Sequence, residues 1–196
     1  MFGYLKGKIS MKNPAFIYVE CAGVGYHVNI SLNTYSKLEN ATDIQIFTHM
    51  QVREDDISLY GFADIEERGL FVLLISVSGV GANTARVILS YMTTEEIKRA
   101  IMHEDEVSLG KVKGIGPKTA KRIILDLKDK IMKGSGAEAV NMPGGNNIMR
   151  DEALSALVAL GFSKANVDKL ISQILSKHKE VDNVEDLIKI VLKQIN

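Results

Sequence analysis

The spacing of hydrophobic residues changes once along the chain, near residue 64. Before that point apolar and polar residues alternate over five short stretches, which are residues 5–9, 15–20, 23–30, 44–52 and 57–62. Alternation with a period of two is typical of strands that bury one face. Five short strands separated by Gly, Asn and Pro predict a small β-barrel or sandwich over residues 1–63.

From residue 64 onward the apolar residues recur every three or four positions, as they do along one face of a helix. Asp64 and Thr93 stand where helix N-caps are expected, and acidic residues follow each of them in the first turn. Pro117 fits the first position of a further helix. Residues 64–133 are therefore predicted to form an entirely helical domain.

A glycine-rich stretch without periodicity follows at residues 134–148 and predicts a flexible linker. Beyond it, three amphipathic runs predict a three-helix module over residues 149–196, near the lower size limit for independent folding. The chain as a whole is therefore predicted to be an α+β multidomain protein. Its order would be barrel, helical domain, linker and three-helix module.

A short sequence motif occurs twice in the helical segment, at residues 78–85 and 113–120. Each copy has a Gly-apolar-Gly core between two helical runs. Such a helix-hairpin-helix motif lets glycine backbone approach a ligand and presents the N–H groups of the next helix to an anion. Two copies in register predict a domain that grips nucleic-acid phosphates. The candidate phosphate-binding residues are Gly79, Gly81, Asn83, Thr84, Lys113, Gly114, Gly116, Lys118, Thr119 and Lys121.

The distribution of charge supports this interpretation, although 24 basic and 24 acidic residues give the chain a net charge of zero. Residues 111–133 contain 8 basic and 2 acidic side chains, a local net charge of +6 around the second copy. The local field matters more than the total charge for attracting a polyanion. The first copy is less basic, so it is expected to rely on its backbone donors.

Other features of the chain point to a cytoplasmic protein without cofactors. The single cysteine, Cys21, excludes an internal disulfide and fits a reducing compartment. The first residues lack the layout of a signal peptide, and the longest apolar run, residues 70–75, is too short to cross a bilayer. No His or Cys spacing indicates a metal site.

The order of these segments resembles the RuvA family, the Holliday-junction-binding subunits of the bacterial branch-migration complex. The resemblance covers the whole chain and is carried by residues 52–55, residues 59–62, the two Gly-x-Gly phrases and residues 156–162. It implies an OB-fold barrel and a homotetramer, with one or two tetramers on each four-way junction. It also implies a tail that binds a hexameric RuvB-like AAA+ ATPase, and a junction-resolving RuvC-like endonuclease as a further partner.

Two more sets of candidate residues depend on this resemblance. Residues 54–56 form an acidic turn, which would ordinarily be only a solvated hairpin. The resemblance implies that Glu54 and Asp55 form an acidic pin at the centre of the tetramer, where carboxylates repel phosphates and hold the crossover open. The role of Asp56 stays open. Candidate motor-binding residues in the UBA-like tail are Leu160, Phe162 and Leu170.

Three alternative functions fit the chain less well than junction binding. A phosphate loop of an ATPase requires lysine directly after the second glycine, whereas Pro117 stands between Gly116 and Lys118. A DNA glycosylase or lyase needs a base pocket and a placed carboxylate or lysine on a larger helical scaffold. A generic DNA tether explains the hairpins but gives the acidic turn and the tail no role. Together with the resemblance to the RuvA family, this favours a non-catalytic junction-binding subunit, and the resemblance implies that it acts in homologous recombination, DNA repair and the SOS response.

Overall fold

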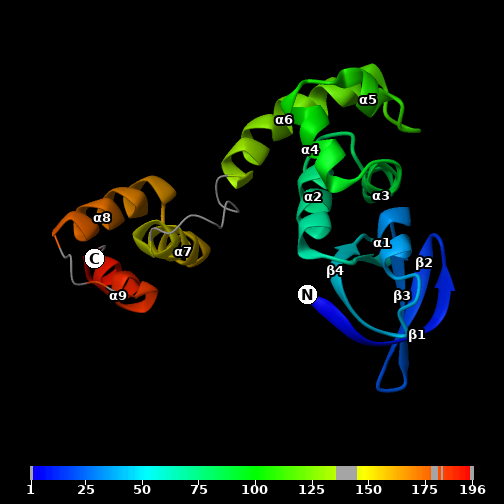
Figure 1. Ribbon diagram of the computed structural model, residues 1–196, viewed down its shortest axis with the longest axis horizontal. Coiled ribbons are helices and arrows are strands. Elements are labelled where there is room, and N and C mark those ends of the chain that lie inside the picture. Colours follow the sequence, from blue (N-terminus) through cyan, green and yellow to red (C-terminus); the bar gives the residue numbers. More distant parts are fainter. Residues whose placement is uncertain (1, 136–144, 178–180, 182, 195–196) are drawn as a thin grey trace. The chain divides into compact units, whose positions relative to one another are not determined.

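The computed structural model describes residues 2–135, 145–177, 181 and 183–194 (Figure 1). The chain divides into two compact units, residues 1–133 and residues 134–196. Among the described residues, no helix is both long enough and apolar enough to cross a lipid bilayer.

The first unit begins with a closed β-barrel, as the alternating pattern predicted. Within the described residues its strands are β1 (Tyr4–Asn13), β2 (Phe16–Cys21), β3 (Val24–Ile30), β4 (Asp43–Val52) and β5 (Ile57–Phe62). They close in the order β1-β2-β3-β5-β4, and only the β3–β5 pair is parallel. Apolar side chains that alternate along the strands, such as Ile17, Val19 and Ile46, fill the interior.

A short helix interrupts the barrel where the sequence predicted only strands and loops. Helix α1 (Leu32–Lys37) lies between β3 and β4, and the Ser31 hydroxyl caps it by accepting from the N–H of Thr34. Six residues make fewer than two turns, so no helical period is recognisable in the sequence. The prediction that residues 1–63 are all β was wrong at this point.

The helical part of the first unit starts where the period changes. Its helices are α2 (Ile65–Ile75), α3 (Ala82–Tyr91), α4 (Thr94–Met102), α5 (Glu106–Gly110) and α6 (Pro117–Ser135). The two predicted N-caps are confirmed. The Asp64 side chain accepts from the N–H of Glu67, and Thr93 forms a reciprocal capping box with Glu96.

Helix α2 joins the helices to the barrel through one apolar and one polar contact. The fully buried ring of Phe71 lies with its centroid 5.1 Å from that of Tyr60 and 4.9 Å from that of Phe62. One turn earlier, the buried Glu67 carboxylate accepts hydrogen bonds from the hydroxyls of Ser31 and Thr34. These contacts hold the barrel and helices α2–α6 in a single compact unit.

The second unit contains three helices, α7 (Gly145–Ala159), α8 (Lys164–Lys177) and α9 (Val184–Gln194), in its described residues. Their buried residues form one small core, made of Met149, Ala153, Leu157, Val167, Ile171, Ile174, Leu187 and Val191. Helix α6 extends to Ser135 and α7 begins at Gly145, so both ends of the predicted linker, residues 134–148, are helical. The middle of that predicted linker, residues 136–144, lies outside the described residues.

Candidate nucleic-acid interface

The two glycine-containing turns, residues 77–81 and 112–116, are built by the same backbone hydrogen bonds. The N–H groups donate to carbonyl oxygens at matching positions: Val80 to Val77 and Ile115 to Val112, each over 3.0 Å, and Ala85 to Gly81 and Ala120 to Gly116, each over 2.9 Å. Each donor and each acceptor in one turn is offset by 35 residues from its counterpart. The repeat in the sequence is thus a repeat in backbone geometry.

Glycine occupies the four positions of these turns for two different structural reasons. Gly79 and Gly114 have φ values of +91° and +92°, in the left-handed region where other residues are strained. Gly81 has extended backbone, with φ −82° and ψ 167°. A Cβ added at Gly81 or at Gly116 would meet no atom within 4 Å outside the chain neighbours. Packing therefore does not require glycine at these two positions. Because glycine has no side chain, it leaves the N-terminus of the following helix open.

Helices α3 and α6 both begin without a side-chain cap. Gly81 makes no capping hydrogen bond, and Gly116 has no side chain with which to make one. The first N–H groups of a helix have no acceptor within the helix, and they carry the positive end of its dipole. Each turn is therefore followed by an open group of donors suited to an anion such as a phosphate.

The side chains singled out from the sequence surround these open helix ends. Asn83 is exposed, as are Lys113, Lys118 and Lys121, whereas Thr84 and Thr119 are half-buried. None of the three lysines forms an ion pair with the part of the chain that the structure describes. Their charges remain available to a ligand.

Other basic residues of the same segment contact protein instead. Lys128 pairs with Glu104, and Nζ of Lys130 lies 3.3 Å from the hydroxyl of Ser76. Arg122 donates to Ser78 at the start of the first repeat. The local charge of +6 is therefore divided between a group of free lysines and a group that ties α6 to its neighbours. The sequence placed Arg122 in the basic segment but gave no signal for this contact.

The acidic turn connects β4 to β5 at the edge of the barrel. The N–H of Arg53 donates to the carbonyl oxygen of Asp56 over 2.8 Å and closes the turn. The Asp56 carboxylate accepts a hydrogen bond from Ser58, so this acid stabilises the turn. Glu54 and Asp55 are exposed, and neither carboxylate has a hydrogen bond or ion pair with a described residue. The structure thus gives the three acids different surroundings.

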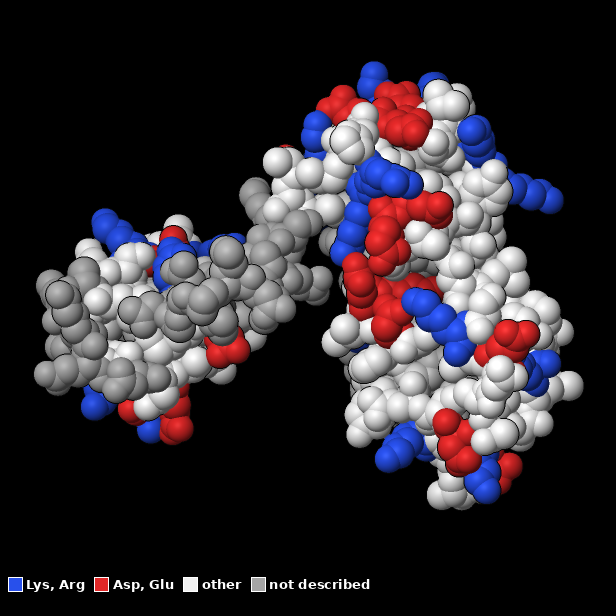
Figure 2. All heavy atoms as spheres, in the orientation of Figure 1, with Lys and Arg blue, Asp and Glu red and all other residues white. Residues whose placement is uncertain are grey.

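Figure 2 shows a second concentration of acidic side chains, over helices α2 and α4. Lysines lie at the margins of this acidic surface (Figure 2). Lys37 lies 2.6 Å from Asp64, and Lys98 lies 2.5 Å from Glu66. Because these charges neutralise one another locally, this surface has little attraction for a polyanion.

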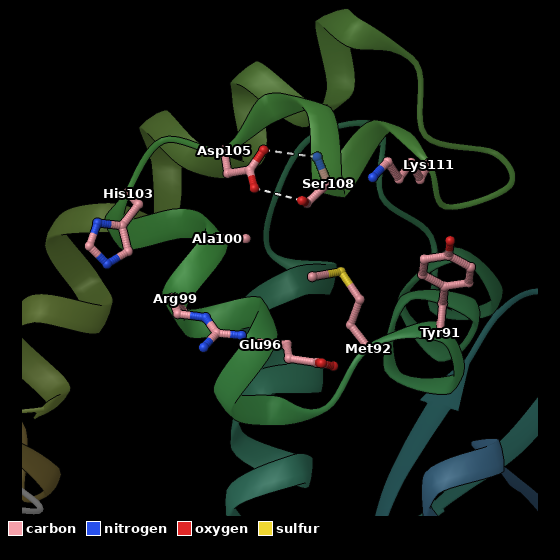
Figure 3. Close-up of a pocket in the computed structure, with 9 residues that line it drawn as sticks. All are labelled: Tyr91, Met92, Glu96, Arg99, Ala100, His103, Asp105, Ser108 and Lys111. Carbon is pink, nitrogen blue, oxygen red and sulfur yellow. Dashed lines mark hydrogen bonds between the residues drawn. The ribbon is translucent and has the colours of Figure 1, made fainter.

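An open hollow of about 410 Å³ lies between the end of α3 and helices α4 and α5 (Figure 3). The Asp105 carboxylate points to Ser108 and accepts from both its N–H and its hydroxyl, and these hydrogen bonds lower the pKa of Asp105. Glu96 accepts from the N–H of Thr93. Both acids of the hollow therefore act as helix caps. Among the described residues, no group of three or more His, Cys, Asp or Glu side chains is arranged to hold a metal.

The three candidate residues of the tail differ in exposure. Leu160, just after α7, is 63 % exposed, whereas Phe162 and Leu170 pack partly against the module core. Gly161 has a φ of +97°, and the N–H of Phe162 reaches back to the carbonyl oxygen of Leu157 over 3.2 Å. This C-cap folds Phe162 inward and leaves Leu160 outside.

Three family descriptions match consecutive parts of the chain. Residues 1–61 match the RuvA N terminal domain, residues 71–129 match the SAM-like helix-hairpin-helix tandem, and residues 149–196 match the RuvA C-terminal domain. The second match covers both glycine-containing turns.

Curated relatives are similar over the full length of the chain. The chain is 46% identical to a protein of Christiangramia forsetii and 45% identical to one of Bacteroides fragilis, in each case over 100% of both sequences. It is 41% identical to a protein of Amoebophilus asiaticus over 98% of this chain and 100% of that protein. All three are named Holliday junction branch migration complex subunit RuvA. With the barrel, the paired hairpins and the C-terminal helices in the same order, the chain belongs to the RuvA family.

Proposed function

We propose that this chain binds four-way DNA junctions, holds their strands open and serves as the DNA-binding subunit of a branch-migration complex. The observation that carries the proposal is the pair of open helix N-termini after residues 77–81 and 112–116, which share one hydrogen-bond pattern. The similarity of the whole chain to its relatives supports the proposal, because these relatives are named as subunits of the Holliday junction branch migration complex.

The two turns would hold phosphates of the DNA backbone. Backbone N–H groups of α3 and α6 supply the donors, and Lys113, Lys118 and Lys121 add positive charge beside the second turn. Phosphate contacts position a protein on DNA without reading its bases. Binding should therefore depend on the shape of the DNA and weaken steeply with salt.

The acidic turn would act by repulsion. Glu54 and Asp55 carry exposed carboxylates that no described residue neutralises. Beside a phosphate, such charges are unfavourable, and more so in a crevice than in open water. In a homotetramer, four copies would gather these acids at the crossover and keep the strands apart.

The assembly we propose has a homotetramer, or two, on the junction and a hexameric RuvB-like ATPase bound to the tail. A junction-resolving RuvC-like endonuclease would share the same DNA. The exposure of Leu160 on the three-helix module supports a contact with the motor there. Because α7 begins at Gly145, deletion of residues 145–196 removes the whole module without cutting a helix.

A glycosylase or lyase activity is less well supported. The hollow beside α4 and α5 holds two carboxylates, and both accept hydrogen bonds from helix N-termini. A base-excising enzyme needs a deep pocket with a carboxylate or lysine free to act on the base. The generic tether differs from the proposed function in one measurable property, the preference for junctions.

A competition gel shift tests the proposal. A labelled four-way junction is challenged with unlabelled linear duplex of the same arm sequences at several salt concentrations. The proposed function requires that the junction complex persists at duplex excess and at moderate salt. Equal competition by duplex, with both complexes lost together as salt rises, would reduce the protein to a generic phosphate-binding tether.

A further inference from the structure

An aromatic cluster lies on the outer face of the barrel, on strands β2 and β3. The ring centroids of Phe16, Tyr18 and His27 lie 4.8–5.6 Å from one another. Tyr18 is 39 % exposed, His27 is exposed and Phe16 is half-buried. Tyr18 pairs with His27 across the strands, and the 50 % exposed Met11 flanks it on β1.

The barrel interior does not need these side chains. Residues on either side of Tyr18, Ile17 and Val19, point inward and are fully buried. Aromatic rings exposed as a group on a soluble surface usually mark an interaction site. In OB-type barrels this face, on the second and third strands, is one that binds oligonucleotides.

The cluster is connected to the first phosphate-binding turn. Arg86, one turn into α3, donates from Nη1 to the carbonyl oxygen of Ala15 over 2.8 Å and approaches Oδ1 of Asn29 at 3.4 Å. Ala15 precedes Phe16, and Asn29 pairs with Phe16 across the strands. The aromatic face and the start of α3 are therefore held together by one arginine.

The cluster also continues toward the acidic turn. The parallel pairing of β3 with β5 covers only Val28 to Ile30, and a groove of about 500 Å³ lies beside it. His27 and Asn29 line the groove on one side, and Asp56 and Ile57 line it on the other. The surface from the acidic turn to the first hairpin thus passes over His27.

We propose that Phe16, Tyr18 and His27 form a stacking platform for unpaired DNA bases, placed between the acidic turn and the first phosphate-binding turn. The inference rests on the proposed function. Strands held apart at a crossover lose base pairs, and an exposed base regains stacking on an aromatic face. A strand that runs from the acidic turn to the first hairpin crosses this platform.

The charges around the platform favour bases over phosphates as its ligand. The neighbouring outward row, on β1 and β2, places Lys8 opposite Glu20, so these two charges offset each other beside the platform. A neutral aromatic surface bounded by a phosphate-binding turn fits the bases of a strand whose backbone is held elsewhere.

The test compares a fully paired four-way junction with one that carries unpaired adenines at the crossover. The variant combines Phe16→Leu with Tyr18→Leu, which keeps apolar side chains but removes the two rings on β2 and leaves His27 as the only ring of the platform. Tyr18→Phe keeps the ring, and Tyr4→Leu removes a ring that is 56 % exposed elsewhere on the barrel. Melting temperatures establish that all variants are folded.

The wild-type protein, Tyr18→Phe and Tyr4→Leu should bind the junction with unpaired adenines about fivefold to tenfold more tightly than the paired one, since each stacked base strengthens binding. The double variant should bind both junctions equally, with the affinity of the wild type for paired DNA. A 2-aminopurine at an unpaired position should be quenched by the wild type and not by the double variant.

Three results would overturn the platform. They are equal wild-type affinity for the two junctions, a preference that survives in the double variant, and a double variant whose mass in solution falls with both affinities. The last result would assign the face to contact between copies of the chain. Failure of the proposed function is a different result, in which the wild type does not prefer a paired junction over duplex. In that case, binding to a duplex with bulged adenines tests the platform.

Discussion

Arg122 on α6 contacts Ser78 at the start of the first repeat, although 44 residues separate them in the sequence. Its Nη1 atom lies 3.3 Å from the carbonyl oxygen and 3.2 Å from the hydroxyl of Ser78. Ser78 directly precedes Gly79, whose positive φ shapes the first turn. One arginine on the helix that follows the second turn therefore holds the first turn in place.

Replacing Arg122 with lysine should weaken junction binding while keeping the charge. The lysine side chain is one bond shorter than that of arginine, so its ammonium does not reach the position of Nη1 beside both oxygens of Ser78, and the two turns lose a mutual restraint. We expect a loss of about threefold to tenfold in affinity, equivalent to about 1 kcal/mol, with an unchanged slope against salt. Fluorescence anisotropy at several salt concentrations measures both quantities.

The matched control is Lys130→Arg, because Lys130 is a second cation on α6 and approaches Ser76 at the end of α2. It should leave junction affinity unchanged. If Arg122→Lys also binds as the wild type does, the contact with Ser78 has no part in binding. A flatter salt slope in Arg122→Lys would instead indicate that Arg122 itself contacts a phosphate.

The two glycines of the second turn should separate folding from binding. Gly114→Ala places a methyl group at a φ of +92° and should destabilise the first unit by about 1–2 kcal/mol. Gly116→Ala meets no neighbouring atom within 4 Å, so its only cost should be the lower preference for alanine at a helix N-cap, about 0.5–1 kcal/mol in the free energy of unfolding. Its methyl group should nevertheless obstruct the open end of α6 and reduce junction affinity.

Denaturant unfolding and anisotropy on the same two variants check this prediction. Gly116→Ala with wild-type affinity would mean that no phosphate approaches the start of α6. Gly81→Ala gives the equivalent comparison for the first turn, where a Cβ also meets open space.

Local patterns were sufficient to predict much of this fold from the sequence. Strand alternation, the caps at Asp64 and Thr93, and the repeated glycine turns each depend on residues a few positions apart. The contact of Arg122 with Ser78 depends instead on how α6 packs against the first turn, which no local pattern specifies. Helix α1 was missed because six residues are too few to establish a period.

The sequence identified the candidate site residues but did not distinguish between neighbours of the same type. Three consecutive acids at residues 54–56 look alike in the sequence, yet only Asp56 is tied to a neighbour, through Ser58. Leu160 and Phe162 are two positions apart, and the C-cap at Gly161 sends them in different directions. These distinctions arise from turn geometry that the residue types alone leave open.

Neutralising the acidic turn should not weaken junction binding. Combining Glu54→Gln with Asp55→Asn removes two carboxylates that have no hydrogen bond or ion pair with a described residue, so the fold should be unaffected. With repulsion of phosphates removed, affinity should stay equal or rise by about twofold to tenfold at low salt. Branch migration with the motor should change at the same time.

Asp56→Asn is the control for this pair. It removes an acid from the same turn but one that accepts a hydrogen bond from Ser58, so its effect should appear in stability more than in branch migration. A clear loss of junction affinity on neutralising Glu54 and Asp55 would contradict repulsion as their role.

The buried Glu67 should make stability depend on pH. Burial raises the pKa of Glu67 above its ordinary value of 4.5, against the hydrogen bonds from Ser31 and Thr34, which lower it. Between the ordinary pKa of the unfolded chain and the raised pKa of the folded protein, Glu67 holds a proton in the folded state that it has lost in the unfolded state. The stabilising contribution is therefore complete below about pH 4.5 and is lost as pH rises through the folded pKa.

Glu67→Gln cannot ionise, so its stability relative to the wild type should improve as the pH rises from 4.5 toward neutrality. Thermal unfolding of both proteins across this range measures the difference. Glu67→Ala, which leaves two buried hydroxyls without their acceptor, should be less stable by about 1–3 kcal/mol at every pH. A constant difference between the wild type and Glu67→Gln would show that Glu67 keeps an ordinary pKa.

Leu160 should serve binding to the motor without serving the fold of the three-helix module. Its side chain is 63 % exposed, so Leu160→Ser should change the free energy of unfolding by less than about 0.5 kcal/mol. Leu157, one turn earlier, is fully buried, so Leu157→Ala should lower the free energy of unfolding of the module by about 2–5 kcal/mol. Branch migration by the RuvB-like ATPase should fall with Leu160→Ser while junction binding stays unchanged. If Leu160→Ser supports migration fully and only the unfolded Leu157→Ala module fails, the motor contacts a different face of the module.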